Sequence, residues 1–323
     1  MVDLRASAMV FDEQAVAPIL SRPSVVAGID FGPASLAAAR WAFAHVARDA
    51  HAILSHVGMS SGEVGNGDDA LSSPRGLERV TSALRGGLGG FGTMLHVASA
   101  RAIVRLGSPS YWLPSLAEEM EAGLIVLGRR SDANRRRIGE PNVIERVTRR
   151  TRASVLVVPE GVSAPPGSII AAIDQSAAGA RVVTTAMALA DLHGSQVIVL
   201  HVVTPQRGEY CRAVGNTRRG RASKERPAAS MDGAQVAGRP APRWFTSLIP
   251  TASECTGKIV SGDPAHAIMA EARELGAAMV VVGKRGDDQS PRGSIGSVVR
   301  ELLASASVPV LAVEADPALP EAL

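Results

Sequence analysis

The sequence has few aromatic residues and almost no cysteine. Phenylalanine, tryptophan and tyrosine make up 3% of the 323 residues, and the two cysteines are Cys211 and Cys255. So few aromatic side chains argue against a nucleic-acid surface that works by base stacking. Two cysteines without CxxC spacing indicate neither a disulfide framework nor a zinc site, and they suit a reducing compartment.

Long hydrophobic runs are missing too. The longest apolar runs, near 124–127 and 277–282, are far shorter than the roughly 20 residues that a membrane helix needs. The first residues carry acidic side chains where a secretory signal would be basic. We therefore expect a soluble, cytoplasmic protein that does not contact a membrane, with residues 1–22 as an N-terminal tail.

The composition and the length of the chain indicate two globular domains. Hydrophobic residues make up 46% of the chain and charged residues 20%, and the length exceeds that of one ordinary domain. The cores must be aliphatic, which is typical of buried parallel strands covered by helices. The net charge of +3, from 34 basic and 31 acidic residues, is too small to indicate a partner.

The chain also contains an internal repeat of about 145 residues. SVVAGID at 24–30 matches SIIAAID at 168–174, and LIVLG at 124–128 matches MVVVG at 279–283. Each half alternates β-branched runs with helical runs, which indicates βαβ units. We therefore predict an α/β fold of two tandem doubly wound (Rossmann-like or flavodoxin-like) domains, each with a five-stranded parallel sheet and helices on both faces.

We place the two domains at 23–160 and 167–314. The last strand-like run of each half, 154–158 and 308–313, has no helix after it, so we expect these two edges to pair within the chain. A segment at about 205–243 holds nine basic and three acidic residues without a sustained period, which predicts a disordered basic insertion.

A glycine-rich motif follows the strand-like run 279–282. Gly283 and Gly286 are followed, after nine residues, by Gly296 and Ser297, which open a helical run. Glycines at a strand exit let backbone N–H groups approach a ligand, and a helix N-terminus adds unpaired donors and a positive dipole. The motif therefore predicts an anion site where doubly wound sheets bind ligands. Taken singly, these residues could also be plain turn glycines and a helix cap.

This G-x-x-G, nine residues, G-S pattern resembles the ATP-binding signature of the universal stress protein family. Both halves also carry the family's Asp after the first strand, its His-Val in the second strand and its Val-rich last strand, so the chain looks like a tandem member. The resemblance implies ATP, with Mg²⁺ or Mn²⁺ on its phosphates, in the second half. It implies these cofactor-binding residues: Ala172, Asp174, Val202, Val282, Gly283, Arg285, Gly286, Gly296, Ser297 and Val298.

The first half departs from this motif. Gly128 is kept, but Ser131 replaces the second glycine, and Pro141 and Asn142 replace the closing pair. Proline has no N–H to donate to a phosphate. We therefore expect one nucleotide site per chain, in the second half, with the first half as a degenerate partner.

Other motif-like segments are weaker evidence for a ligand site. Gly87, Gly89 and Gly92 satisfy G-x-G-x-x-G but follow a helical run, and Gly257-Lys258 lacks the rest of a P-loop. His56 and His201 lie in strand-like runs and are read as structural. Asp174 could cap the following turn instead of contacting a base.

The function that we predict is an ATP-binding regulatory module of the stress response, with at most slow ATP hydrolysis, no catalytic residue and no metal ligand from the protein. The alternative is a scaffold of the same fold that binds no nucleotide and acts through protein contacts. A nucleic-acid tether built from the basic insertion is disfavoured, because no recognition motif accompanies it. Whether two chains form a homodimer stays open.

Overall fold

The computed structural model describes residues 24–58, 99–130, 142–162, 167–204, 241–250, 255–286 and 295–314. It also describes three isolated residues between 59 and 98 and the backbone of short strands between 230 and 240. The predicted tail at 1–22 and the glycines at 87, 89 and 92 lie outside these residues.

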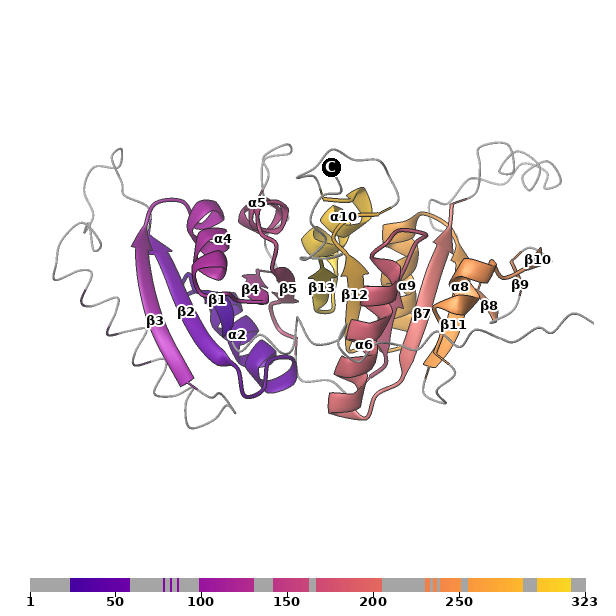
Figure 1. The fold of residues 1–323 in the computed structure, drawn as a ribbon, viewed down its shortest axis with the longest axis horizontal. Helices are drawn as coiled ribbons and strands as arrows, with labels where there is room; N and C mark the ends of the chain where they lie inside the picture. Colours follow the sequence, from indigo (N-terminus) through magenta and orange to yellow (C-terminus); the bar gives the residue numbers. More distant parts are fainter. Residues whose placement is uncertain are drawn as a thin grey trace, which may run out of the picture.

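Eleven of the described strands form one continuous sheet, in the order β3-β2-β1-β4-β5-β13-β12-β6-β7-β11-β8 (Figure 1). The first half contributes five parallel strands: β1 (Ser24–Gly28), β2 (His51–Gly58), β3 (Ser99–Leu106), β4 (Leu124–Arg129) and β5 (Ser154–Pro159). The second half repeats the order with β6 (Ile169–Ala172), β7 (Val197–Val203), β11 (Cys255–Ser261), β12 (Met279–Gly283) and β13 (Val310–Val313). Two doubly wound parallel units are thus confirmed.

The two halves join through their last strands. β5 and β13 pair antiparallel, with Leu156 opposite Leu311 and Val157 opposite Val310. These four side chains are at most 1% exposed. The pairing that the sequence predicted is therefore present, and it covers both of the strand edges that the separate halves would expose.

Helices cover both faces of the sheet (Figure 1). On one face lie α2 (Pro33–His45), α6 (Gly179–His193) and the short α8 (Arg243–Ser247), and on the other lie α4 (Pro109–Glu119), α5 (Val143–Arg150), α9 (Pro264–Glu274) and α10 (Ser297–Ser305). Neighbouring strand residues such as Val25 and Val26 belong to opposite cores, which explains the unbroken aliphatic runs. Within the described residues, no helix is long and apolar enough to cross a membrane.

The predicted insertion at about 205–243 is partly described. Residues 205–229 lie outside the described residues, but β8 (Ser230–Asp232) pairs antiparallel with β11, and β9 (Gln235–Val236) pairs with β10 (Arg239–Pro240). Disorder is therefore the wrong expectation for these last residues. The physical reason is that β11 is the edge of the parallel sheet, so its free backbone groups accept another strand regardless of local periodicity.

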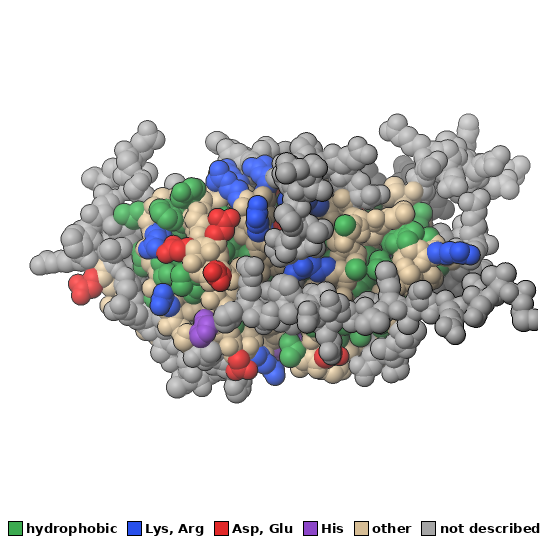
Figure 2. All heavy atoms as spheres, viewed as in Figure 1, with side chains coloured by type: hydrophobic (Ala, Val, Ile, Leu, Met, Phe, Trp, Pro, Cys, Tyr) green, Lys and Arg blue, Asp and Glu red, His purple; other side chains and the backbone are tan. Residues whose placement is uncertain are grey.

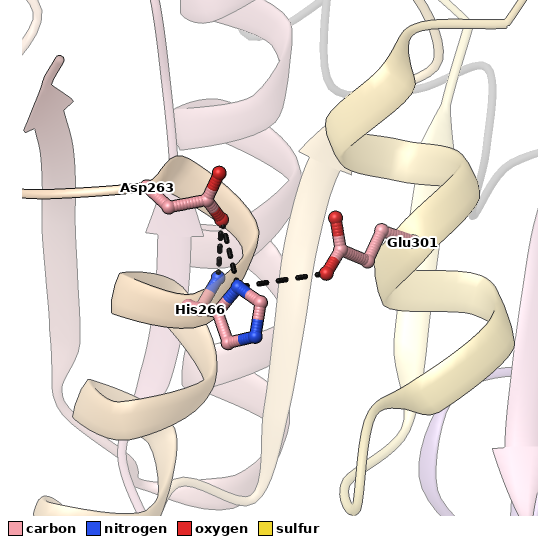
Figure 3. A group of neighbouring side chains, drawn as sticks. All are labelled: Asp263, His266 and Glu301. Carbon is pink, nitrogen blue, oxygen red and sulfur yellow. Dashed lines mark hydrogen bonds and ion pairs between the residues drawn. The ribbon is translucent and has the colours of Figure 1, made fainter. Parts of the chain in front are cut away.

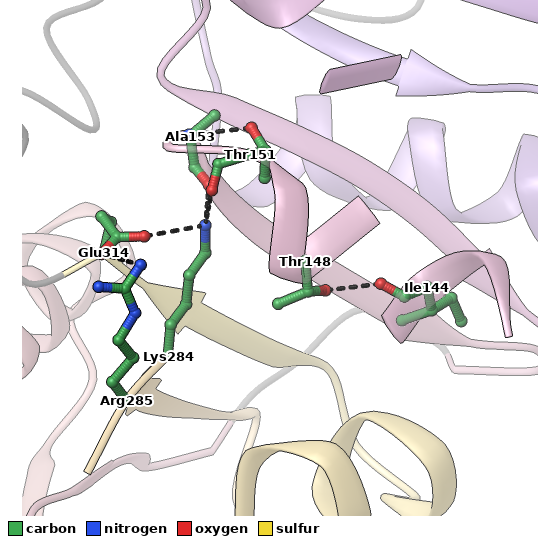
Figure 4. Close-up of polar contacts among 7 residues, drawn as sticks. All are labelled: Ile144, Thr148, Thr151, Ala153, Lys284, Arg285 and Glu314. Carbon is green, nitrogen blue, oxygen red and sulfur yellow. Dashed lines mark hydrogen bonds and ion pairs between the residues drawn. The ribbon is translucent and has the colours of Figure 1, made fainter. Parts of the chain in front are cut away.

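Lys284, directly after β12, crosses into the first half (Figure 4). Its Nζ donates to the carbonyls of Thr151 and Ala153 at 2.9 and 2.5 Å and lies 3.4 Å from a carboxylate oxygen of Glu314. Its side chain is 2% exposed, and this burial lowers the pKa of the ammonium to about 8, although Glu314 opposes the shift. Lys284 therefore ties the end of β12 to the segment between α5 and β5.

Arg129 makes the matching contact in the opposite direction. It occupies the position of Lys284 in the first half, and its guanidinium donates to the carbonyls of Ala304, at 3.0 Å, and Ala306, at the end of α10. Each half thus stabilises the last helix of the other, because a cation there satisfies carbonyls that the helix leaves unpaired.

Candidate functional site

A cavity of about 320 Å³ lies at the carboxyl edge of the second half, where β6 and β12 are neighbours and the strand order reverses. This is where doubly wound sheets bind ligands. The structure brings all ten residues assigned from the sequence to its lining: Ala172, Asp174, Val202, Val282, Gly283, Arg285, Gly286, Gly296, Ser297 and Val298. The cavity is therefore open rather than filled by its own side chains.

The walls of the cavity are mostly aliphatic. Ala172 ends β6, Val202 lies near the end of β7, and Ile268 faces the cavity from α9. Asp174 accepts a hydrogen bond from the Ser176 N–H at 3.1 Å, so it does cap the following turn while also lining the cavity. Such a pocket suits a flat apolar group with a few hydrogen-bonding edges.

Gly283 is required by packing. A Cβ on it would lie 2.7 Å from the Cβ of Ala178, at the start of α6. Its first-half equivalent, Gly128, is equally constrained, because a Cβ there would clash with the backbone of Ala34. These glycines therefore let a helix approach the strand end, whether or not a ligand binds.

Gly296 is in a different situation. Its N–H donates to the Lys284 carbonyl at 3.0 Å, and the nearest atom to a Cβ on it would be the Gly286 nitrogen, at 3.6 Å. This is an ordinary contact distance, so packing among the described residues does not demand a glycine. A side chain there would instead occupy the space in front of the Gly286 amide.

The start of α10 is open to an anion. Gly296 is its N-cap and makes no side-chain capping bond, and the first turn holds no acidic residue. The amides of the first turn have no partner within the helix, and the helix dipole is positive there. This N-terminus, with Ser297 as its first residue, lines the cavity.

The start of α5, at the same place in the first half, is closed. Asn142 caps the helix by accepting from the Glu145 N–H at 2.7 Å, and Glu145 puts a negative charge in the first turn. An anion there would meet an occupied donor and a like charge. Ser131 and Pro141 lie outside the described residues, so the loop itself is not seen.

The basic residues near the start of α10 mostly serve the domain interface. Arg300 lies 3.2 Å from Glu145 of α5, and Lys284 is buried between the halves. Figure 2 shows further Lys and Arg side chains over α5, where Arg146 and Arg149 are exposed. Arg285, which lies 3.9 Å from Glu314, is the described basic residue that lines the cavity.

The two histidines and the P-loop-like pair have structural roles. His56 and His201 donate through Nδ1 to the carbonyls of Ile29 and Ile173, at 2.7 and 3.0 Å. Gly257 and Lys258 lie inside β11, and the Lys258 ammonium is 2.7 Å from the buried carboxylate of Glu271. His201 also lines the cavity, which the sequence did not indicate because a strand histidine has no ligand-specific signal.

Three exposed side chains, those of Asp263, His266 and Glu301, meet between α9 and α10 (Figure 3). His266 of α9 lies 3.0 Å from Asp263 and 3.6 Å from Glu301 of α10, through its Nδ1. Asp263 caps α9 by accepting from the His266 N–H at 3.2 Å. The hydrogen bond between its carboxylate and the His266 ring lowers the pKa of Asp263 and raises that of His266. The cluster is explained by helix capping and a link between α9 and α10.

The fold and the cavity define a tandem doubly wound α/β protein whose second half has an open crevice at its topological switch point. The model of the universal stress protein family matches the chain twice, over residues 22–159 and 167–314, so the chain belongs to that family. A sequence search among curated proteins gave no match.

Solved structures share the fold. A universal stress protein from Archaeoglobus fulgidus DSM 4304 is similar with a TM-score of 0.63 and 16% identity, over 92% of this chain and 100% of that one. A protein of unknown function from Pseudomonas aeruginosa PAO1 aligns with a TM-score of 0.53 and 14% identity, over 92% and 94% of the chains. A universal stress protein solved in complex with cAMP covers 43% of this chain, with a TM-score of 0.33 and 22% identity.

Proposed function

We propose that the second half binds ATP and that the protein acts as a nucleotide-regulated module of the stress response. The observation that carries the proposal is the uncapped N-terminus of α10 beside Gly296, at the edge of an open aliphatic cavity. A triphosphate supplies the negative charge that this helix end favours, and the cavity accommodates the base.

Each group of the ligand has a counterpart in the cavity. The base would lie among Ala172, Val202 and Ile268, with Asp174 accepting from its N–H donors. The phosphates would lie against the Gly286 amide and the first turn of α10, with Arg285 as a nearby cation. Among the described lining residues Asp174 carries the sole carboxylate, so Mg²⁺ or Mn²⁺ would be held by phosphate oxygens.

The cavity suits regulation by nucleotide binding better than it suits rapid ATP hydrolysis. Orienting a water for attack on a phosphate needs a positioned acceptor. Of the described lining residues, His201 uses its Nδ1 on Ile173, and Asp174 lies on the side of the cavity proposed for the base. Nucleotide binding would instead act on the domain interface, because Lys284 lies between Gly283 and Arg285 and reaches the first half.

The test is to identify the small molecules that the purified protein retains and to measure whether a substitution in the motif abolishes ATP binding. Mass spectrometry of small molecules released from freshly purified protein should find an adenine nucleotide. In calorimetry, Gly296→Val should abolish ATP binding, because its side chain fills the space before the Gly286 amide. Gly86→Val is the matched control, since a Cβ at Gly86 meets nothing within 4 Å.

The scaffold alternative gives the opposite result. If no nucleotide is retained, and wild type and Gly296→Val both fail to bind ATP with Mg²⁺, the nucleotide-free reading holds. Titration with cAMP, the ligand of one solved family member, separates a general adenine site from one that needs a triphosphate.

A further inference from the structure

The helix that begins at the second-half cavity is held at its other end by the first half. Ser297 and Val298, at the start of α10, line the cavity. At the C-terminal end, Arg129 of the first half donates to the carbonyls of Ala304, at 3.0 Å, and Ala306, the C-cap residue. With nine residues, α10 is about 14 Å long. One short helix therefore connects the cavity of the second half to a side chain of the first.

The start of α10 is tied to the first half as well, through Lys284. The N–H of Gly296, the N-cap residue, donates to the Lys284 carbonyl at 3.0 Å. The Lys284 ammonium in turn donates to the carbonyls of Thr151 and Ala153 (Figure 4). Both ends of α10 are therefore attached to the first half, directly at the C-terminal end and through one residue at the N-terminal end.

A further polar contact lies along the helix. The Nε of Arg300 in α10 lies 3.2 Å from a carboxylate oxygen of Glu145 in α5. The buried residues of α10 pack through apolar contacts, which have no preferred direction. Hydrogen bonds, by contrast, weaken steeply when distance or angle changes. The contacts with Arg129 and Glu145 therefore restrict sliding and rotation of α10 more closely than its apolar packing does.

The position of α10 matters because its first turn is the proposed phosphate site. The Gly286 amide and the amides of that turn can bind one phosphate together only if they lie at hydrogen-bond distance from it at the same time. Donors that are held in place before the ligand arrives bind it more tightly, since less order has to be created on binding. The equivalent contact in the other direction has no such consequence, because Lys284 holds α5, whose start is capped by Asn142.

We propose that the first half positions the phosphate site of the second half, and that Arg129 and Glu145 are the positioning residues. They raise the affinity for a triphosphate without touching it, by fixing α10 from the side away from the ligand. This inference rests on the proposed ATP binding and adds its regulation. It gives the half with the altered motif a role in the function of the half with the intact one.

The experiment is calorimetry of the full chain with ATP and Mg²⁺ and, separately, with adenosine. Arg129→Met and Glu145→Gln should each weaken ATP binding about 3- to 30-fold, the range found for residues that couple to a site without contacting its ligand. Adenosine binding should stay unchanged, because the base would lie among Ala172, Val202 and Ile268, on β6, β7 and α9. A general loss of structure would weaken both ligands alike.

Two comparisons separate positioning from charge. Arg146→Met removes the same charge from the exposed face of α5 and should leave ATP binding unchanged. Glu145→Gln removes a negative charge, so the electric field alone would strengthen ATP binding, whereas loss of positioning weakens it. If circular dichroism shows that Arg129→Met does not fold, Glu145→Gln decides, because its partner Arg300 is 53% exposed and the loss of this pair should be tolerated.

The outcomes that overturn the inference are distinct from failure of the proposed function. ATP affinity that is the same in wild type, Arg129→Met and Glu145→Gln would overturn the inference and leave ATP binding standing. Equal losses for ATP and adenosine would also overturn it, because they indicate a purely structural contact. Stronger ATP binding by Glu145→Gln would show an effect of charge instead of position. No ATP binding by wild type would overturn the proposed function and this inference with it.

Discussion

At the scale of single residues, equivalent positions of the two halves have diverged in ways that geometry makes visible. Gly283 and Gly128 are constrained alike by the helix packed on them, whereas Gly296 has room for a side chain. Ser55 and Leu200 occupy the same place in the sheet with different polarity. In the sequence motif, all the glycines look equivalent. The distances from a Cβ at each position to its neighbours show which glycine is required by packing and which leaves space for a ligand.

Gly283→Ala should lower the free energy of unfolding by about 1–3 kcal/mol, because its Cβ would lie 2.7 Å from that of Ala178. Gly296→Ala should change it by no more than about 1 kcal/mol, the usual scale for an N-cap replacement. Urea unfolding measures both. Equal losses from the two variants would contradict the separation of a packing glycine from a ligand glycine.

The interaction of His266 with Asp263 and Glu301 should make the free energy of unfolding depend on pH. Its pKa is raised by the hydrogen bond with Asp263 and by the nearby Glu301, so its contribution is full below the unfolded value of 6.5 and is lost as pH rises through the folded pKa. The side chain is 81% exposed, so the effect should not exceed about 1 kcal/mol.

Urea unfolding of wild type and His266→Gln at about pH 5.5 and about pH 8.5 checks this, with the larger difference expected at the lower pH. The control is His51→Gln, whose ring bonds to the Ser99 hydroxyl. A difference between wild type and His266→Gln that is the same at both pH values would rule out a charged His266 contact.

At the scale of elements, the ends of α5 and α10 show why one half is open to an anion and the other is not. α5 starts with a capping Asn142 and carries Glu145, while α10 starts with Gly296 and no acid in its first turn. The C-terminal end of α5 contacts Lys284 of the second half, and that of α10 contacts Arg129 of the first half. The loop that would bind phosphate is thereby attached to the domain interface.

Lys284→Met should destabilise the protein by about 3 kcal/mol, because it leaves buried Glu314 without its nearest cation and two carbonyls without their donor. Arg146→Met, on the exposed face of α5, is the control and should have little effect. Thermal or urea unfolding measures both. A loss below about 1 kcal/mol for Lys284→Met would mean that the buried contact contributes little net stability.

At the scale of the whole molecule, the antiparallel pairing of β5 with β13 turns two domains into one sheet. Because this pairing is satisfied within the chain, a second copy could not use these strands to associate. The open edges of the described sheet are instead β3 and β8. A homodimer of the intact chain would therefore need a different surface.

Expressing residues 167–323 alone should produce a dimer, because β13 then presents an apolar, unpaired edge, with Val310 and Leu311 uncovered. Sedimentation at micromolar concentration measures this, with the intact chain run beside it. A stable monomer of the fragment would show that the edge of β13 does not drive association.

The fold class and the glycine motif of the second cavity could be predicted because they depend on local pattern, whereas the full set of ten lining residues came from the resemblance to the universal stress protein family. Aliphatic runs mark buried parallel strands, and fixed glycine spacing marks a strand-loop-helix turn. The strand β8 could not, since it forms against the edge of β11 rather than from its own periodicity. The contacts of Lys284 and Arg300 at the domain interface could not be predicted either, because a basic residue beside a loop looks the same in sequence whether it faces a ligand or another domain.

Sequence alone determined that the chain is a duplicated α/β unit with a glycine motif that is intact in its second copy, because repeats, periodicity and spacing are properties of the chain itself. Tertiary structure decided which polar groups are satisfied and which are open. The burial of Lys284 and its contacts with Thr151 and Ala153 depend on atoms from distant segments. Satisfaction of a hydrogen bond is a matter of distance in space, which no local pattern encodes.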